Sequence, residues 1–191
     1  MPETQVDKST IAARLQDVEE RIRRACDRAG RERDEITVVA VTKVFPLKFV
    51  ARHADVFHAL DSDRLADELD KRARKNERTL PCFVQVNTSG EESKYGLEPS
   101  ETHDFLDRMV ERDHLRVPGL MMLASFADDP ETVRPEFERL RELQASYADE
   151  KHPTVDLQDL SMGMSNDFEV ALEEGATHLR LGTALFGPRP T

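Results

Sequence analysis

Short apolar runs alternate with longer amphipathic segments along most of this chain, and few folds accommodate that order. The run at 36–42 is apolar and rich in β-branched residues, which is typical of a strand buried on both faces of a parallel sheet. An amphipathic helix is expected before it, over 9–29, with Gly30 as its stop. The same order of strand and helix continues along the chain and predicts one α/β domain with helices covering a parallel sheet.

The pattern predicts further elements at regular intervals. Six strands are expected, at 36–42, 55–60, 82–87, 117–123, 155–162 and 178–186. Helices are expected at 9–29, 62–75, 100–112, 166–174 and after the cap Asp129. Asn166 and Glu169 match a capping box. An open doubly wound sheet and a closed (β/α) TIM-type barrel both fit this order, and the Gly-x-Gly-x-x-Gly and P-loop signatures of nucleotide-binding sheets are absent.

Charge and composition disfavour several kinds of partner. The 191 residues include 27 Lys and Arg against 38 Asp and Glu, a formal charge of −11, which disfavours binding to nucleic acid. No run of about 18 apolar residues is present and the N-terminus lacks signal-peptide features, so no membrane span or export is expected. Cys26 and Cys82 have no motif spacing and are expected to be reduced thiols of a cytoplasmic protein.

Residues suited to ligand binding lie at or just after the ends of four predicted strand segments. They are Lys43, Asn87, Ser165 with Asn166, and Gly182 with Thr183. Because the carboxyl ends of parallel strands share one face, we expect these residues to meet there. The six histidines lack metal-ligand spacing and no Gly-x-Ser-x-Gly elbow is present, so neither a metal site nor a serine hydrolase is predicted.

Each candidate has a functional and a purely structural interpretation. Burial of Lys43 would favour a neutral amine that attacks carbonyl groups, whereas a lysine at a barrel end can also extend into water. Ser165 could help a helix N-terminus hold a phosphate or only cap that helix. Gly182 could admit a ligand to the backbone or serve packing alone. Arg180 shares a strand face with Gly182, and an inward arginine needs an anionic or acceptor partner.

Four segments of the chain are similar to one known family. Val39–Lys43, Gln85–Leu97, Leu160–Phe168 and Arg180–Gly187 closely resemble, in the right order, the YggS/PROSC family of pyridoxal 5′-phosphate (PLP) homeostasis proteins. The last two segments are the most specific, and the resemblance runs from about residue 10 to the C-terminus. It implies a single (β/α)₈ barrel of the alanine racemase N-terminal type over 1–191, with 1–8 expected to be disordered.

The resemblance also implies roles for the candidate residues. Lys43 would hold PLP as a Schiff base, and Ser165 with the backbone around Gly182 and Thr183 would hold its phosphate. Arg180 would lie near the cofactor, toward either the pyridine nitrogen or the phosphate. An arginine at the pyridine nitrogen would disfavour protonation of that nitrogen and weaken the electron sink, which suits a carrier better than a catalyst.

The function that the resemblance implies is PLP homeostasis, with PLP as the cofactor. Asn87 would line the mouth of the site. The protein would buffer PLP and deliver it to PLP-accepting apoenzymes without turnover of its own, and a monomer is expected. The alternative is a fold-type III PLP-dependent racemase or decarboxylase. Such enzymes usually need a second domain, and this chain ends at Thr191, directly after the last predicted strand.

The chain departs from the family after Pro46. The family continues there with two βα units, which carry a Gly-Glu-Asn motif and a His-x-Ile-Gly-x-Leu-Gln motif, whereas this sequence passes directly to Leu47. Only eleven residues separate Lys43 from Asp55, which barely admits a crossover helix. Either the printed sequence omits about 45 residues, or the protein lacks two βα units. We favour the former, because a barrel without two adjacent strands exposes edges and half a core; a true deletion would predict a PLP-free remnant.

Overall fold

The computed structural model describes residues 8–40, 47–91, 94–147 and 152–187, and within them the chain forms one six-stranded sheet. The strands are β1 (Thr37–Ala40), β2 (Phe57–Leu60), β3 (Leu80–Gln85), β4 (Leu115–Met121), β5 (Val155–Ser161) and β6 (His178–Leu181). The α-helices are α1 (Lys8–Ala29), α2 (Leu47–His53), α3 (Asp63–Lys75), α4 (Pro99–Asp107), α5 (Arg134–Ser146), α6 (Phe168–Glu173) and α7 (Thr183–Phe186). Three 3₁₀ segments are η1 (Arg33–Glu35), η2 (Arg108–Glu111) and η3 (Pro130–Val133).

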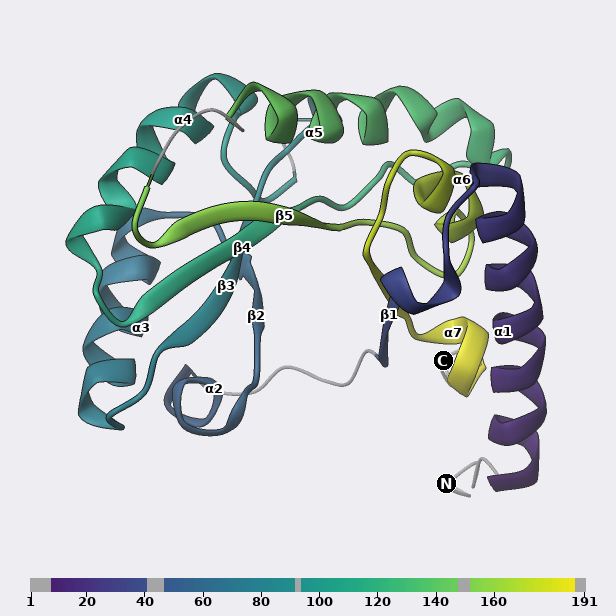
Figure 1. Ribbon diagram of the computed structural model, residues 1–191, viewed down its shortest axis with the longest axis horizontal. Coiled ribbons are helices and arrows are strands. Elements are labelled where there is room, and N and C mark those ends of the chain that lie inside the picture. Colours follow the sequence, from purple (N-terminus) through teal and green to yellow (C-terminus); the bar gives the residue numbers. More distant parts are fainter. Residues whose placement is uncertain (1–7, 41–46, 92–93, 148–151, 188–191) are drawn as a thin grey trace.

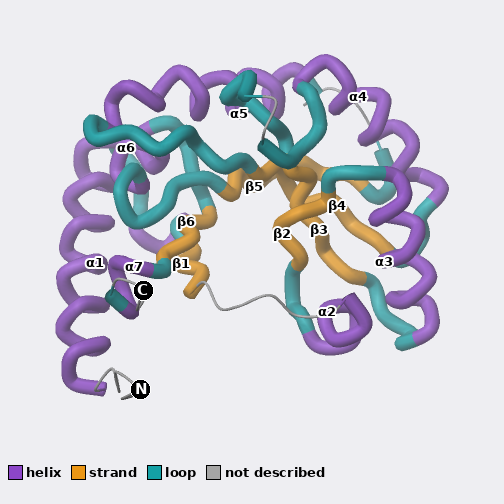
Figure 2. Tube along the Cα trace, turned by 180° about the vertical axis from the view of Figure 1, so that it is seen from behind, coloured by secondary structure: helices purple, strands orange, loops and turns teal. Residues whose placement is uncertain are grey.

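All neighbouring strands of the sheet are parallel, and their order is β1-β6-β5-β4-β3-β2. The sheet curves, and the helices cover its convex side (Figure 1). The parallel α/β prediction and the six strands are therefore confirmed. β1 and β2 follow each other in the chain but form the two opposite edges of the sheet, so the described strands make a partial barrel (Figure 2).

The two faces of the sheet differ in chemistry. The convex face and the helices over it form an apolar core in which each fully buried side chain contributes about 1.5–3 kcal/mol. This core includes Ile22, Leu60, Leu69, Val84, Phe105, Leu120, Phe137, Leu140, Leu172 and Leu179. The concave face carries aromatic and polar side chains instead, namely His58, Phe83, Ser161, His178 and Arg180. A polar inner face that remains buried is the natural place for a ligand.

A register irregularity in β2 allows His58 and Leu60 to lie on opposite faces of the sheet. Phe57 pairs with Cys82 and Leu60 pairs with Val84, so three residues of β2 advance while two of β3 do. Simple alternation would place His58 on the same face as Leu60. Because of the irregularity, Leu60 lies in the apolar core while His58 lies beside Phe83 on the concave side.

Several local predictions were wrong in detail. The last strand ends at Leu181 rather than at 186, because the short helix α7 begins at Thr183 with Gly182 as its N-cap. Asn166 caps no helix; its amide donates to the Ala127 carbonyl (2.9 Å), and α6 starts two residues later. The stretch before Asp55 does admit a helix, the seven-residue α2. The helix expected over 100–112 is divided into α4 and η2.

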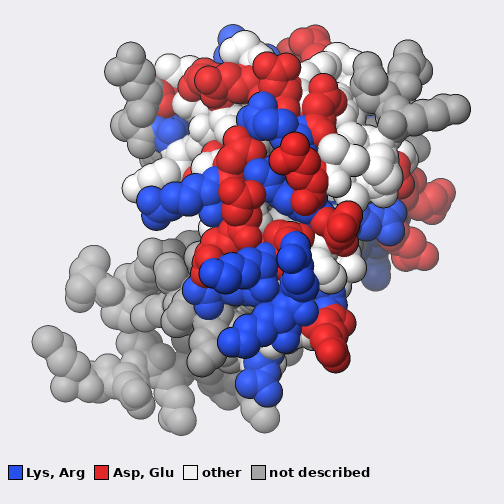
Figure 3. All heavy atoms as spheres, turned by 90° about the vertical axis from the view of Figure 1, so that its left-hand side faces the viewer, with Lys and Arg blue, Asp and Glu red and all other residues white. Residues whose placement is uncertain are grey.

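The outer surface is held by ion pairs between helices. Acidic and basic side chains mix over the side of the molecule that α3 and α4 form (Figure 3). There the buried Arg112 contacts the carboxylates of Asp63 and Asp67, both at 2.8 Å. Cys26 and Cys82 are buried free thiols, as expected. None of the described helices is long and apolar enough to cross a lipid bilayer.

Candidate functional site

The site forms where the loop that follows β5 meets the end of β6. The Met162 amide donates to the His178 carbonyl (3.2 Å), and the Arg180 amide donates to the Gly163 carbonyl (3.0 Å). These bonds continue the β5–β6 pairing past the end of β5. Gly163 has a φ of +89°, and a side chain there would place its Cβ 2.8 Å from the Cβ of Ala171 in α6. Glycine is therefore required for the loop to turn this close to the helix.

Arg180 projects from β6 into the concave face and is only 8% exposed. Its Nη1 donates to the Ser161 hydroxyl (2.8 Å), and its Nη2 donates to the Met122 carbonyl (2.6 Å). Both acceptors are neutral, and no described carboxylate forms an ion pair with this guanidinium. Burial lowers the pKa of Arg180 to about 10, although the charge of Asp167 acts in the opposite direction. Arg180 is therefore a buried cation with an incomplete set of counter-charges.

Ser165 and the start of α7 come together across the same loop. The Ser165 hydroxyl accepts a hydrogen bond from the Ala184 amide (3.0 Å). Ala184 belongs to the first turn of α7, which begins at Thr183 after Gly182. Ser165 thus contacts the residue directly after Thr183. The partner helix is α7 rather than the helix directly after Ser165.

Asn87 follows β3 and organises its own loop. Its side-chain amide donates to the Glu91 carbonyl (3.0 Å), and its side-chain oxygen accepts from the Ser89 hydroxyl (2.8 Å). Gly96 closes this loop, because a Cβ there would lie 2.8 Å from the Asn87 backbone nitrogen. Among the residues that the structure describes, no hydrogen bond joins Asn87 to Arg180 or Ser165. Lys43, the fourth part of the predicted site, lies outside the described residues.

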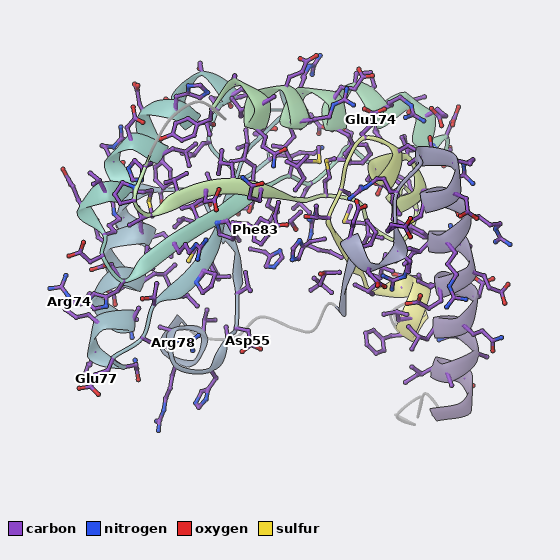
Figure 4. All side chains as sticks on the ribbon, viewed as in Figure 1. Asp55, Arg74, Glu77, Arg78, Phe83 and Glu174 are labelled. Carbon is purple, nitrogen blue, oxygen red and sulfur yellow. The ribbon has the colours of Figure 1, made fainter. Side chains whose placement is uncertain are left out.

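Two further residues of the concave face were missed by sequence reasoning. His58 Nδ1 lies 2.9 Å from the Ser161 hydroxyl, and the imidazole stacks on Phe83 with ring centroids 4.5 Å apart. Phe83 is labelled in Figure 4, on the side of the sheet that faces away from the helices. His58 and Ser161 are 103 positions apart in sequence, so no local spacing signalled their contact. No group of three or more metal-ligating side chains occurs among the described residues.

His58 predicts a specific dependence of stability on pH. Burial, together with the charge of Arg180, lowers its pKa from 6.5 to about 4. The unfolded chain therefore takes up a proton as the pH falls through about 6.5, while the folded chain does so only near pH 4. The contribution of His58 to the free energy of unfolding is complete above about pH 6.5. It decreases below that pH, by about 1–2 kcal/mol at pH 5. Urea unfolding at pH 7 and pH 5 measures this loss.

The matched variants for this measurement are His58→Phe and His103→Phe. The first should reduce the loss between pH 7 and pH 5, with the remainder due in part to His178, whose pKa burial also lowers. The second changes a histidine on the outer surface, beside Ser146, and should leave the loss unchanged. An equal loss in all three proteins would contradict the assignment to His58.

Comparison with known proteins places this arrangement in a family. The sequence model described as "Alanine racemase, N-terminal domain" matches residues 9–190. A pyridoxal phosphate homeostasis protein of Aquifex aeolicus is 34% identical over 223 residues, which cover 92% of this chain and 97% of that protein. This chain belongs to the YggS/PROSC family. The alignment with the Aquifex protein is longer than the 191 residues of this chain. The relative therefore contains residues that have no counterpart in this sequence.

For other members of the family the matched share of their length varies. The pyridoxal phosphate homeostasis protein of Vibrio cholerae is 38% identical over 142 residues, 74% of this chain but only 59% of that protein. The solved structure of PipY from Synechococcus elongatus without PLP is 30% identical, with a TM-score of 0.68, over 77% of this chain and 69% of that one. PipY with PLP bound aligns at 24% identity with a TM-score of 0.74 over 93% of this chain and 100% of that one, and supports the fold.

Proposed function

We propose that this protein binds PLP for intracellular homeostasis of the cofactor, in a single domain that spans residues 1–191. The observation that carries the proposal is the buried Arg180 guanidinium, whose described hydrogen bonds go only to neutral oxygens. Buried cations require an anion or a strong acceptor, and a pyridine nitrogen or a phosphate supplies one. The names of the family relatives, and the PLP-bound structure of PipY, agree with this chemistry.

The residues at the strand ends fit the different parts of PLP. When bound, the cofactor supplies an aldehyde for capture by an amine and a phosphate that needs hydrogen-bond donors. Lys43 is the proposed amine. Ser165 and the backbone of Gly182 and Thr183 form the proposed phosphate site, where the Ser165 hydroxyl and the α7 amides already lie together. We propose that Asn87 shapes the mouth, since its side chain fixes the loop after β3.

The role of Ser165 is tested by comparing two ligands that differ only in the phosphate. The variant Ser165→Ala should bind PLP about tenfold more weakly, because one hydroxyl contact to a charged group is worth about 1.5 kcal/mol or more. Its affinity for pyridoxal, which has no phosphate, should not change. Equilibrium titrations by absorbance measure both affinities.

The control for this experiment is Ser146→Ala, at the exposed end of α5, which should bind both ligands as the original protein does. Equal weakening of PLP and pyridoxal by Ser165→Ala would show that the hydroxyl supports the loop generally. That result would remove Ser165 from the proposed phosphate site.

We further propose that the protein buffers PLP and delivers it to PLP-accepting apoenzymes in the cytoplasm as a monomer, without turnover of its own. An arginine that donates to the pyridine nitrogen disfavours protonation of that nitrogen and reduces the capacity of PLP to stabilise carbanions. Incubation with single L-amino acids and chiral analysis of the products tests the absence of turnover. Racemisation that disappears in Lys43→Ala would contradict the carrier role and favour a racemase.

A further inference from the structure

The concave face contains a chain of hydrogen bonds that joins three strands. Arg180 on β6 donates to the hydroxyl of Ser161 on β5 (2.8 Å), and that hydroxyl lies 2.9 Å from Nδ1 of His58 on β2. β5 and β6 are neighbours, but β4 and β3 separate β5 from β2 in the sheet. The contact between Ser161 and His58 therefore spans the concave side, where curvature brings the two strands within reach.

The proton positions in this chain follow from the chemistry of its members. A guanidinium only donates, so Ser161 accepts from Arg180 and has one hydroxyl proton left to donate. We assign His58 Nδ1 as the acceptor of that proton, which places the hydrogen of the neutral imidazole on Nε2. Ser161 is fully buried, so no bulk water replaces His58 as the acceptor. The lowered pKa of His58 is consistent with the neutral form.

The surroundings hold His58 in one orientation. Its ring stacks on Phe83, with an interplanar angle of 26°, and meets the edge of His178 at a centroid distance of 5.8 Å. The ionisable groups that face it are Arg180 and His178, and no described carboxylate is bonded to it. An acidic residue in place of His58 would neutralise the arginine. A neutral acceptor orients the guanidinium and leaves its positive charge for a ligand.

We propose that His58 is a positioning residue for the cofactor site: by fixing the Ser161 hydroxyl it holds the Arg180 guanidinium in the orientation that meets the bound ligand. The value of this role to PLP binding rests on the proposed function. The positioning of Arg180 itself belongs to the protein without ligand and is measured separately.

The experiment compares three single variants and one double variant with the unaltered protein, and uses Arg180→Lys only to assign a signal. His58→Phe keeps a flat ring against Phe83 but removes the acceptor. His58→Asn keeps an acceptor close to the position of Nδ1, and Ser161→Ala removes the central hydroxyl. The first readout is the side-chain NMR signal of Arg180 in the PLP-free protein, assigned with Arg180→Lys. The second is the PLP affinity, together with the absorption spectrum of the bound cofactor.

The expected results separate positioning from simple packing. In His58→Phe the Arg180 signal should show freer rotation and faster hydrogen exchange, and PLP should bind about tenfold more weakly. His58→Asn should restore both toward the original values. Ser161→Ala should change the Arg180 signal and the PLP affinity as much as His58→Phe does. The double variant should cause little further change, because both substitutions break the same chain of hydrogen bonds. Thermal melting of each variant verifies that it is folded.

Three outcomes would overturn the proposal. The first is an unchanged Arg180 signal in His58→Phe. The second is an equal loss of PLP affinity in His58→Phe and His58→Asn, which would indicate that His58 only packs against its neighbours. The third is full additivity of the His58 and Ser161 effects. If the unaltered protein takes up no PLP, the proposed function fails, but the Arg180 signal still decides whether His58 positions that side chain.

Discussion

Replacement of Lys43 by alanine is expected to abolish covalent capture of PLP. Borohydride reduces a lysine Schiff base to a stable amine, so the unaltered protein incubated with PLP and then reduced should gain one pyridoxyl group. Peptide mapping should place that group on Lys43, because it is the lysine directly after the apolar strand predicted at 36–42. Lys43→Ala should gain none. Intact-protein mass spectrometry before and after reduction measures the result.

A second lysine serves as the matched control. Lys71 lies on α3 and is exposed, and Lys71→Ala should accept the pyridoxyl group as the unaltered protein does. Adduct on both variants would indicate non-specific modification of surface amines. An adduct that stays in Lys43→Ala and maps to one other lysine would move the Schiff base away from Lys43.

The same mass measurement addresses the two βα units that have no counterpart in this sequence. A protein heavier than 21.8 kDa by about two βα units would show that residues are missing from the printed sequence and would supply strands between β1 and β2. A protein of 21.8 kDa that carries the pyridoxyl group would show that six strands suffice. A protein of that mass without the group would contradict the proposed function.

Introduction of one methyl group at Gly119 is expected to destabilise the fold by about 3 kcal/mol. Gly119 on β4 pairs with Asp159 on β5, and a Cβ at 119 would overlap the carbonyl group of Asp159, 2.6 Å from its carbon. Backbone atoms in the middle of a sheet cannot move aside as a flexible side chain does. Because domains are stable by only about 5–15 kcal/mol, Gly119→Ala should lower the urea midpoint greatly.

Gly90→Ala provides the comparison that isolates the clash. Gly90 has a φ of +74° and open space around its Cβ position, so alanine there meets only backbone strain, about 1 kcal/mol. Far-UV circular dichroism during urea unfolding gives both free energies. If Gly119→Ala unfolds at the same urea concentration as Gly90→Ala, the close approach of β4 to β5 is wrong.

Local signals accounted for much of the fold because they concern neighbours in the chain. The α1 helix was predicted within one residue of its ends from apolar spacing and Gly30, and α3 equally well. The end of the last strand was not, because α7 depends on the Ser165 hydroxyl, which bonds the Ala184 amide from another loop. The prediction that Asn166 caps a helix was wrong for the same reason: its side-chain amide donates to the carbonyl of Ala127, which lies in another loop.

The sequence by itself determined the parallel α/β class, the six strands and the identity of most candidate site residues, because periodicity and motifs are properties of the local chain. Only the tertiary structure decided which groups meet. The register of β2 against β3 places His58 beside Phe83 on the concave face, and the curvature of the sheet brings it to Ser161, although two strands lie between β2 and β5. Contacts between residues 103 positions apart depend on sheet register and bending, and no local spacing encodes those quantities.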